Sequence, residues 1–473
     1  MVPFNPREYQ KRCIRFLLEN GFAGLFLDPG LGKTAIVLGA LQILQRKKLV
    51  RAALVIAPLR PTYFVWPAEV EKWDDFHGLK VAVLHGSKKE AALRSKADVY
   101  VINPEGLPWL CRALSAHNWK GPWPFDMLVV DESTKFKRSN TQRFKLLKPI
   151  LTRFIRRYIL TGTPAPNGLL DLFGQIYLLD LGKALGAFVS HYRMTYFYPG
   201  GYGGYEWLPQ PGAEKKIYQR IEPLVVQLSA KDHLKLPKLF TLPGLPQVEV
   251  TLPEKAMAQY KSMEKQFFID LGKNEEAWAV NAAVASMKCR QVANGGIYTD
   301  RWVEMGELPK ATMAWQKIHD AKTDVVVDLI EELSGKPTLV SFDFHHDKER
   351  LLKELGMNTP VLGSGVSMRA SAGIIERWNA GEIPVLLVNP QSVAHGLNLQ
   401  GGRAVIFHSL TWNLEDYEQL IQRVWRQGQE KAVYVYHIVA KGTIDEVIID
   451  ALGRKGAVQG RLKAALGAYR AKR

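Results

Sequence analysis

Short apolar runs alternate with helical stretches in two separate series, and this alternation restricts the possible folds more than any other feature of the chain. The runs lie at 23–28, 52–58, 81–86, 98–103, 126–132 and 156–164, and again at 337–342, 384–389, 404–409 and 432–439. They are nearly continuous in Val, Ile, Leu and similar residues, as is typical of strands buried on both faces of a parallel sheet. Helical stretches such as 323–335 and 414–427 lie between or beside them. The sequence therefore predicts an α/β fold with two doubly wound parallel-sheet lobes.

A region of different character separates the two series. Segment 196–212 is rich in glycine, proline and aromatic residues and is predicted to be irregular, whereas 254–272 has helical character. We therefore expect an N-terminal lobe at 1–180, a helical insertion and inter-lobe connection at 181–320, and a C-terminal lobe at 321–473.

The charge of the chain indicates a polyanionic partner. Its 473 residues include 63 Lys and Arg but only 46 Asp and Glu, which gives a formal net charge of +17. Such a field attracts nucleic acid, although a basic solubilising surface is the alternative. Neither a membrane span nor an export signal is predicted. The three cysteines, Cys13, Cys111 and Cys289, are far apart and form no CxxC pair, which favours a reducing cytoplasm over a disulfide framework or a zinc site.

The stretch LFLDPGLGKTAIVL, which begins at Leu25, has the pattern of a nucleotide phosphate loop. Gly30 and Gly32 allow the backbone N–H groups of the turn to point inward, and the following helix adds the partial positive charge of its N-terminus. Lys33 is placed to reach the β- and γ-phosphates of a nucleotide, and the Thr34 hydroxyl to bind Mg²⁺. The alternative is a glycine turn before a core helix.

A pair of carboxylates follows another strand of the same series. In MLVVDEST (127–134), the apolar run delivers Asp131 and Glu132 together at its C-terminal end, where open α/β sheets bind ligands. In a phosphate-loop ATPase the first carboxylate holds Mg²⁺, usually through water, and the second polarises the attacking water. Surface acidic pairs are common, so this pair indicates a nucleotide site only in combination with the loop at 30–34.

These pieces resemble a known family. GLGKT (30–34), the Asp-Glu pair and LTGTPAPNGLLDLFGQIYLL (160–179) look like motifs I, II and III of superfamily-two helicases, and the last is similar to that of SWI/SNF-type DNA-translocating ATPases. The resemblance implies two RecA-like lobes that use ATP and Mg²⁺. It assigns catalysis to Lys33, Asp131 and Glu132 and Mg²⁺ to Thr34 and Asp131, partly through water. The implied nucleotide contacts are Pro29, Gly30, Leu31, Gly32, Lys33 and Thr34.

The resemblance extends over the rest of the first lobe. FNPREYQKRCIRFLLENG (4–21) is similar to the leading segment that recognises adenine, which implies nucleotide contacts for Arg7 and Gln10. Segments 55–73 and 100–107 resemble motifs Ia and Ib, which touch the nucleic-acid backbone. Arg60 and Lys72 are the candidates for these contacts, and phosphate contacts of this kind do not read sequence.

The second lobe supplies the remaining motifs. QLIQRVWRQGQ (419–429) resembles motif VI, and the spacing of Arg423 and Arg426 predicts that both project from one face of a helix. Two guanidiniums there would neutralise the charge on the γ-phosphate as arginine fingers. A solvated basic helix face is the alternative. Other segments resemble further family elements, namely motif IV (337–351), motif V with Gly396 (386–407), a short helix ahead of the second lobe (287–296) and a closing helix (442–455).

Some residues depart from the family pattern. Ser133 and Thr134 follow the acidic pair where Ala-His is common, Trp425 stands where His is frequent, and Leu27 replaces the first glycine of the phosphate-loop rule. The long insertions and accessory modules of larger relatives have no room in this chain. A near-minimal motor of this kind favours a phage or bacterial source, and hence a bacterial cytoplasm.

The leading hypothesis is an ATP-driven translocase on double-stranded DNA, bound without sequence specificity. Neither lobe carries a full catalytic set, so hydrolysis would occur in the cleft between them and drive movement by opening and closing. A strand-separating DNA or RNA helicase of the same superfamily is the alternative. A third hypothesis is a nucleotide-dependent DNA clamp or recruitment protein with weak hydrolysis.

Overall fold

The structure is a computed structural model that describes residues 2–115, 119, 121–166, 168–200, 206–234, 236–241, 247–271, 278–299, 314–363, 365–393 and 397–453. The chain divides into two compact units, residues 1–235 and 236–473, and each is described by itself. In the described part, no helix is both long enough and apolar enough to span a bilayer.

The first unit is built on a parallel sheet whose strands follow the order β3-β4-β2-β5-β6-β1-β9. The order is not the chain order, because each crossover helix carries the chain to a new position beside the sheet. The predicted α/β fold is confirmed, and the first series of apolar runs forms six of the strands. The strands are β1 (Phe22–Leu27), β2 (Ala53–Ile56), β3 (Val81–Val83), β4 (Val99–Ile102), β5 (Met127–Asp131), β6 (Arg156–Thr161) and β9 (Val225–Leu228).

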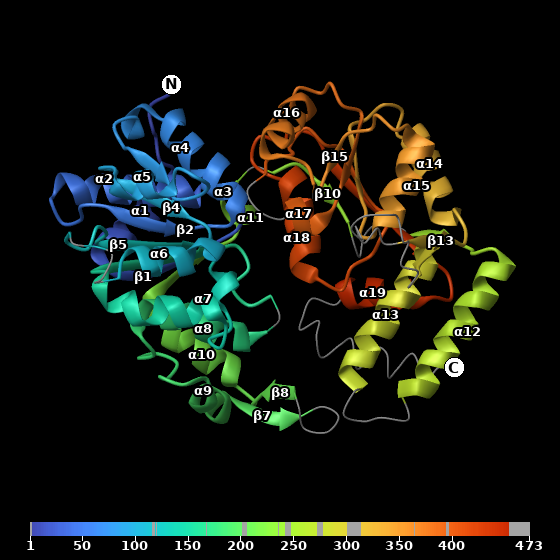
Figure 1. The fold of residues 1–473 in the computed structure, drawn as a ribbon, viewed down its shortest axis with the longest axis horizontal. Coiled ribbons are helices and arrows are strands. Elements are labelled where there is room, and N and C mark those ends of the chain that lie inside the picture. The colour runs from blue at the N-terminus through green and yellow to red at the C-terminus, as the bar shows by residue number, and fades with distance from the viewer. Residues whose placement is uncertain are drawn as a thin grey trace, which may run out of the picture. The chain divides into compact units, whose positions relative to one another are not determined.

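Helices cover both faces of this sheet, so its central strands are almost fully buried. Figure 1 shows α2 and α4 above the strands of this unit and α7, α8 and α10 below them. The helices of the unit are α1 (Glu8–Glu19), α2 (Lys33–Arg46), α3 (Leu59–Phe64), α4 (Trp66–Lys72), α5 (Lys89–Arg94), α6 (Leu107–Ala113), α7 (Gln142–Leu147), α8 (Leu172–Asp180), α9 (Val189–Tyr196), α10 (Ala213–Ile221) and α11 (Ala230–His233).

Within the first unit, two parts of the middle region form strands that the sequence pattern did not indicate. The segment expected to be irregular contains an antiparallel hairpin of β7 (Phe197–Gly200) and β8 (Glu206–Pro209). Its aromatic residues have packing partners, since the Phe197 ring meets Tyr192 edge to face and Trp207 packs against the core of the unit. The second part is β9, which pairs in parallel with β1 and forms one edge of the first sheet.

The second unit also contains a parallel sheet, in the order β10-β18-β17-β14-β16-β15, and β11 pairs with β18 beside this path. The second series of runs forms four of its strands, as predicted. The strands are β10 (Leu239–Phe240), β11 (Val248–Val250), β14 (Thr338–Ser341), β15 (Val361–Leu362), β16 (Val385–Val388), β17 (Ala404–Phe407) and β18 (Val433–Ala440); β12 (Gly296–Tyr298) and β13 (Trp315–Lys317) form a separate antiparallel pair.

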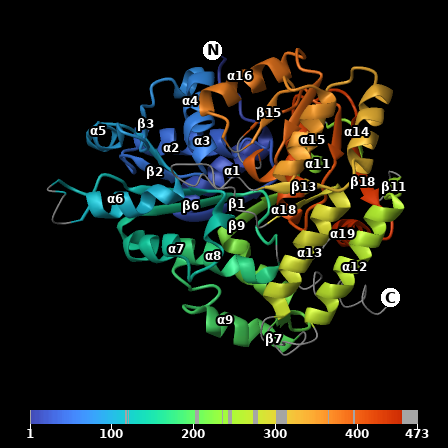
Figure 2. The ribbon, with the colours of Figure 1, turned by 45° about the vertical axis from the view of Figure 1, so that its right-hand side comes forward.

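Two long helices lie in the chain between β11 and β14 of this sheet, and Figures 1 and 2 both show α12 and α13 side by side. The last helix, α19, packs against α13, and the Tyr260 hydroxyl of α12 accepts a hydrogen bond from the Ile444 N–H at its start. The helices of the unit are α12 (Glu254–Leu271), α13 (Trp278–Asn294), α14 (Ala321–Glu332), α15 (His345–Leu355), α16 (Met368–Asn379), α17 (Pro390–Val393), α18 (Leu414–Val424) and α19 (Ile444–Gly453).

Candidate nucleotide site

The loop between β1 and α2 has the backbone geometry of a phosphate cradle. Gly30 and Gly32 adopt positive φ angles of 89° and 77°, a region that residues with a Cβ rarely enter. Helix α2 begins at Lys33, so the N–H groups of its first turn point toward this loop. The Lys33 ammonium donates a hydrogen bond of 2.7 Å to the Leu27 carbonyl. Leu27 is therefore the last residue of β1 and a partner of the lysine, which explains why no glycine is needed there.

Helix α1 holds the far side of the same loop. The Gln10 amide and the Tyr9 hydroxyl both donate to the Leu31 carbonyl at 3.3 Å. The other end of the Gln10 amide accepts a bond of 2.9 Å from the Arg7 N–H. A Cβ on Gly32 would lie 2.6 Å from Gln10 Nε2 and would displace that amide, while the positive φ of Gly32 disfavours any residue with a Cβ. The structure thus places Gln10 beside the loop and Arg7 at the start of the same helix, and their contacts to a nucleotide remain predictions.

An unforeseen tether connects the loop to the edge of the sheet. One oxygen of the Asp28 carboxylate accepts a hydrogen bond of 2.9 Å from the Ala230 N–H and one of 3.2 Å from the Ser229 hydroxyl. The Asp28 N–H in turn donates to the Leu228 carbonyl at the end of β9. The phosphate loop is therefore fixed to a segment 202 residues later in the chain.

The predicted acidic pair stands at the C-terminal end of β5, on the edge of the sheet that also carries the loop. The Asp131 carboxylate accepts a hydrogen bond of 3.1 Å from the Trp66 indole N–H and another of 3.1 Å from the Glu132 N–H. Burial, and then the neighbouring Glu132 carboxylate, raise the pKa of Asp131 to about 6, while the Lys33 ammonium acts in the opposite direction. The structure therefore brings Lys33 and Asp131 into electrostatic contact, as the sequence predicted.

Glu132 is held in a conformation that disfavours most residues. Its φ of 52° and ψ of 59° are left-handed, which costs on the order of 1–2 kcal/mol for a residue with a Cβ. Its Oε2 atom is buried and has no hydrogen-bond partner among the residues that the structure describes. A strained carboxylate with an unused buried acceptor is typical of a site prepared for a ligand.

The donor set at this edge suits Mg²⁺. The ion prefers oxygen ligands and binds through one or two carboxylates together with substrate phosphates and water. Asp131 and Glu132 offer carboxylate oxygens, and Thr34, in the first turn of α2, offers a hydroxyl. The unused Glu132 Oε2 could accept a hydrogen bond from a water molecule in the same site.

A buried hydrogen-bond chain joins the acidic pair to the LTGTP segment. The Ser133 hydroxyl donates to the Gln175 side-chain carbonyl at 2.7 Å, and the Gln175 amide donates to the carbonyls of Pro164 at 2.6 Å and Asp171 at 2.8 Å. Ser133 and Gln175 are both fully buried. Ser133 therefore connects motif II to motif III in this chain, a role that its position in the sequence did not reveal.

Comparison with known proteins agrees with this geometry. The SNF2-related domain family matches residues 9–192, and the helicase conserved C-terminal domain matches residues 321–428. Protein p41 of Acyrthosiphon pisum secondary endosymbiont phage 1 is 35% identical over 98% of this chain and 99% of its own length. The chain belongs to the SWI/SNF-type ATPases of helicase superfamily two.

More distant relatives of this SWI/SNF-type chain are longer. An uncharacterized ATP-dependent helicase of Mycoplasma genitalium is 26% identical over 95% of this chain, which spans only 41% of that protein. A DNA repair and recombination protein of Gallus gallus, RAD54-like, is 23% identical over 96% of this chain and 67% of its own length.

In the SWI/SNF-type chain, the two arginines of motif VI do not share one helix as predicted. Helix α18 ends at Val424, so Arg423 lies in its last turn while Arg426 lies in the turn that follows. The prediction that both project from one helical face is therefore wrong. Trp425 ends the helix with ψ of 85°, and its indole N–H donates to the Pro237 carbonyl at 2.8 Å. Arg423 is buried, and Arg426 donates to the Leu397 carbonyl at 3.4 Å.

The residues predicted to contact nucleic acid lie in helices after the C-terminal end of β2. Arg60 lies in α3, and its side chain is outside the described residues. Lys72 is exposed in the last turn of α4, with its ammonium 4.4 Å from the centre of the Trp73 ring. Gly396 of motif V also lies outside the described residues. The roles of Arg60 and Lys72 remain predictions.

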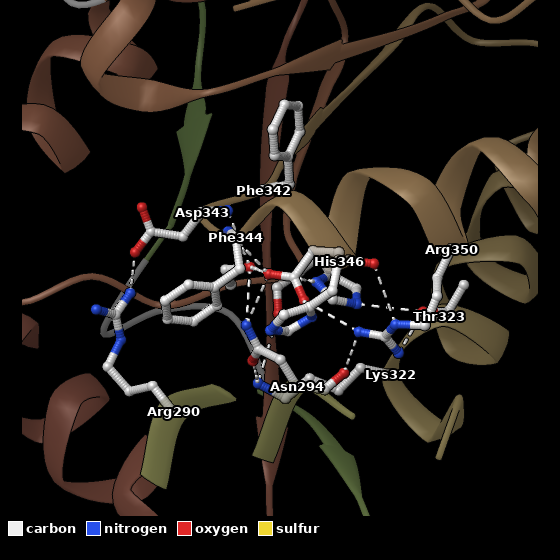
Figure 3. A network of polar contacts seen from close by, with 12 residues as sticks. Arg290, Asn294, Lys322, Thr323, Phe342, Asp343, Phe344, His346 and Arg350 are labelled. Atoms are coloured by element: carbon white, nitrogen blue, oxygen red, sulfur yellow. Dashed lines mark hydrogen bonds and ion pairs between the residues drawn. The ribbon is translucent and has the colours of Figure 1, made fainter. Parts of the chain in front are cut away.

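The second unit carries its own cluster of charges at the C-terminal edge of its sheet (Figure 3). Asp347, in the first turn of α15, accepts hydrogen bonds from the Ser409 hydroxyl at 2.6 Å and the Asn294 amide at 3.0 Å, and Arg350 pairs with it at 3.0 Å. All four side chains are buried. Burial alone would raise the pKa of Asp347, but His346, His408 and Arg350 hold it well below its usual value.

The same cluster joins four helices of the second unit, α13, α14, α15 and α19. The fully buried Lys322 of α14 pairs with Asp445 of α19 at 2.5 Å and donates to the Asn294 side-chain carbonyl at 2.8 Å. Asn294 ends α13, which is longer than the short helix that the sequence predicted at 287–296 ahead of the second lobe. We call Asn294, Lys322, Asp347, Arg350, Ser409 and Asp445 the buried network.

Proposed function

We propose that this chain is an ATP-driven motor that moves along double-stranded DNA. The observation that carries the proposal is the edge of the first sheet, where Lys33, Asp131 and Glu132 come together around a glycine loop. The Lys33 ammonium now bonds the Leu27 carbonyl, and the β- and γ-phosphates of ATP would take over that bond. The Glu132 oxygen without a partner would accept a proton from the attacking water.

Arg423 and Arg426 would complete the reaction from the second unit. The phosphoryl group gains charge on its equatorial oxygens in the transition state, and guanidinium groups stabilise that charge. Because these arginines belong to a different compact unit from Lys33, hydrolysis would require the two units to close on the nucleotide. ATP would then favour the closed arrangement and ADP the open one, which converts the chemistry into movement.

Two observations favour DNA as the track. The chain has a net charge of +17, and its relative in Gallus gallus is named for DNA repair and recombination. Contacts to phosphates position a protein without reading bases, so we expect binding without sequence specificity. A helicase that separates DNA or RNA strands is the second candidate, because a relative in Mycoplasma genitalium is named as an ATP-dependent helicase.

The deciding experiment measures ATP turnover by the full chain with duplex DNA, single-stranded DNA and RNA, together with triplex displacement and duplex unwinding. Duplex-stimulated turnover with triplex displacement and no unwinding is the expected result. Unwinding would instead identify a strand-separating helicase, and tight DNA binding with negligible turnover would identify a clamp. Lys33→Ala is the matched control, because it removes the phosphate contact while leaving the basic surface almost unchanged.

A further inference from the structure

A groove opens along the edge of the first sheet, away from the phosphate loop. Its volume is about 720 Å³. Helix α1 contributes one wall, helix α10 with the turn after it contributes another, and strand β9 lies between them. The lining side chains are those of Arg12, Arg15, Phe16, Glu19, Lys215, Tyr218, Gln219, Ile221, Glu222, Val225, Val226 and Gln227.

The strand in this groove has an unpaired side. Strand β9 is the last strand of its sheet among those that the structure describes, and it pairs only with β1. The Leu228 carbonyl accepts a bond from the Asp28 N–H, so the backbone groups of Leu228 and Val226 point toward β1. Backbone direction alternates along a strand, so the N–H and C=O groups of Val225 and Gln227 point away from β1. Such a row of groups is a template for another strand.

The side chains around this row select a particular partner. Arg12 and Arg15 on α1 and Lys215 on α10 are exposed, and none of them makes an ion pair within the described part of the chain. Phe16, Tyr218 and Val225 are only partly buried and offer apolar surface beside these cations. We propose that this groove binds an extended acidic peptide segment of a partner protein, which adds to β9 as a parallel or antiparallel strand.

Two features favour a peptide over nucleic acid. Glu19 and Glu222 also line the groove, and their carboxylates would repel a continuous phosphate backbone, whereas a peptide can place its acidic residues only opposite the cations. An open strand edge recognises a polypeptide backbone through main-chain hydrogen bonds, and nucleic acid has no equivalent of these. The described residues of the phosphate loop are tethered to the end of the same strand through Asp28, so a bound segment would lie one strand away from the ATP site.

The test measures binding of the full chain to a fluorescein-labelled peptide of about six residues that alternates valine and glutamate, followed by fluorescence anisotropy. The double variant Arg12→Glu, Arg15→Glu should weaken binding by about tenfold or more, because it replaces attraction with repulsion. Lys216→Glu, an exposed residue of α10 outside the groove, is the matched charge control and should leave the affinity almost unchanged.

A second pair of variants tests the strand edge itself. Gln227→Pro removes the outward N–H without removing a bond to β1, and edge strands tolerate proline on their open side. It should weaken peptide binding by several-fold, whereas Gln227→Ala, which keeps the N–H, should bind as the unchanged chain does. Circular dichroism checks that both variants are folded.

Three outcomes would overturn the proposal. The peptide could fail to bind the unchanged chain, it could bind equally well to the double arginine variant, or a peptide with lysine in place of glutamate could bind as tightly. If the double arginine variant instead lost affinity for a short DNA duplex while the acidic peptide did not bind, the groove would belong to nucleic acid. None of these results depends on ATP turnover. The peptide-binding proposal is therefore tested independently of the proposed motor function.

Discussion

The C-terminal edges of the two parallel sheets use charged residues in opposite ways. On the first sheet, Lys33, Asp131 and Glu132 are only half-buried, and Glu132 keeps a buried oxygen without a hydrogen-bond partner in the described part of the unit. On the second sheet, Asp347 and Lys322 are fully buried and bonded to several neighbours. The first edge therefore retains a hydrogen-bond acceptor for a ligand. On the second edge, the charged groups bond one another and so join helices.

The difference shows how one architecture can serve two tasks. A buried charge is tolerated only when it is paired and hydrogen-bonded, so the buried network is a condition for the second unit to fold as it does. The first edge instead carries a left-handed Glu132 and an Asp131 whose pKa is raised to about 6, and a bound cation would lower that pKa. The two edges should therefore respond differently to substitution: the first through activity and the second through stability.

The largest effect is expected at Glu132. Glu132→Gln keeps the size of the side chain but removes the proton acceptor, so turnover should fall on the order of 10²- to 10⁴-fold while ATP binding is retained. Steady-state hydrolysis and binding of a fluorescent ATP analogue measure the two properties separately. Glu90→Gln, an exposed change on α5, is the control. Appreciable hydrolysis by the Glu132 variant would remove this residue from its proposed role and would end the contrast between the two edges.

On the second edge, loss of the central carboxylate should affect stability instead. Asp347→Asn leaves the buried Arg350 without its charge partner, and breaking a buried pair in this way costs about 3–5 kcal/mol. Hydrogen exchange of peptides from α13 and α15 should speed up strongly, while exchange in α2 should not change. Asp328→Asn, exposed on α14, is the matched control. A variant with normal exchange would show that the buried network does not hold these helices.

A fall in pH should also destabilise the second unit, and at a higher pH than it destabilises the first. The His319 Nε2 bonds the Val292 carbonyl at 2.9 Å while its Nδ1 accepts from the Ala321 N–H at 3.2 Å, an arrangement that requires the neutral ring. Burial lowers its pKa from 6.5 to about 4, with Arg350 and Lys322 acting in the same direction and Asp320 against it. Below pH 6.5 the unfolded chain therefore binds a proton that the folded chain does not, so stability falls as the pH falls.

The size of that loss follows from the shift. Each pH unit in this window lowers stability by about 1.4 kcal/mol, which gives about 2 kcal/mol between pH 6.5 and about pH 5. Urea denaturation at several pH values measures it. His319→Gln, whose amide can both donate and accept, should flatten this part of the profile. An unchanged profile in the variant would assign the acid sensitivity to other groups, such as His408 and His437, whose pKa values burial also lowers.

Much of the fold could be predicted because a buried parallel strand appears in the sequence as a short, nearly continuous apolar run. The ten predicted apolar runs became strands, and the loop at Lys33 and the pair at Asp131 fell at the same sheet edge, since the carboxyl ends of parallel strands meet there. The spacing of Arg423 and Arg426 was less informative. Three residues of separation predict one helical face only if the helix continues, and α18 ends between them at Val424.

The parts that escaped prediction depend on contacts between distant residues. Strand β9 is only four residues long and lies outside the alternating series, so its pairing with β1 had no local signal. The hydrogen bond from Trp66 to Asp131 and the tether from Asp28 to Ala230 likewise join segments that only the fold brings together. In the buried network, Lys322 and Asp445 are both buried and paired, although no local sequence pattern indicates it.

The smallest predicted effect is a loss of stability at Ser133 and Gln175. These buried, hydrogen-bonded side chains are where the first edge resembles the second. Ser133 and Gln175 are fully buried and bonded to each other, so they form a closed contact beside the open acidic pair. Ser133→Ala and Gln175→Leu should each cost about 1–2 kcal/mol, because each leaves buried polar groups without partners. If both side chains act through their common hydrogen bond, the double variant should lose less free energy of unfolding than the sum of the two single losses. A double-mutant cycle from urea denaturation measures that difference. Simple additivity would mean that the two side chains act independently, and the link between motif II and motif III would then rest on the packing of Gly174 against the Phe136 carbonyl instead.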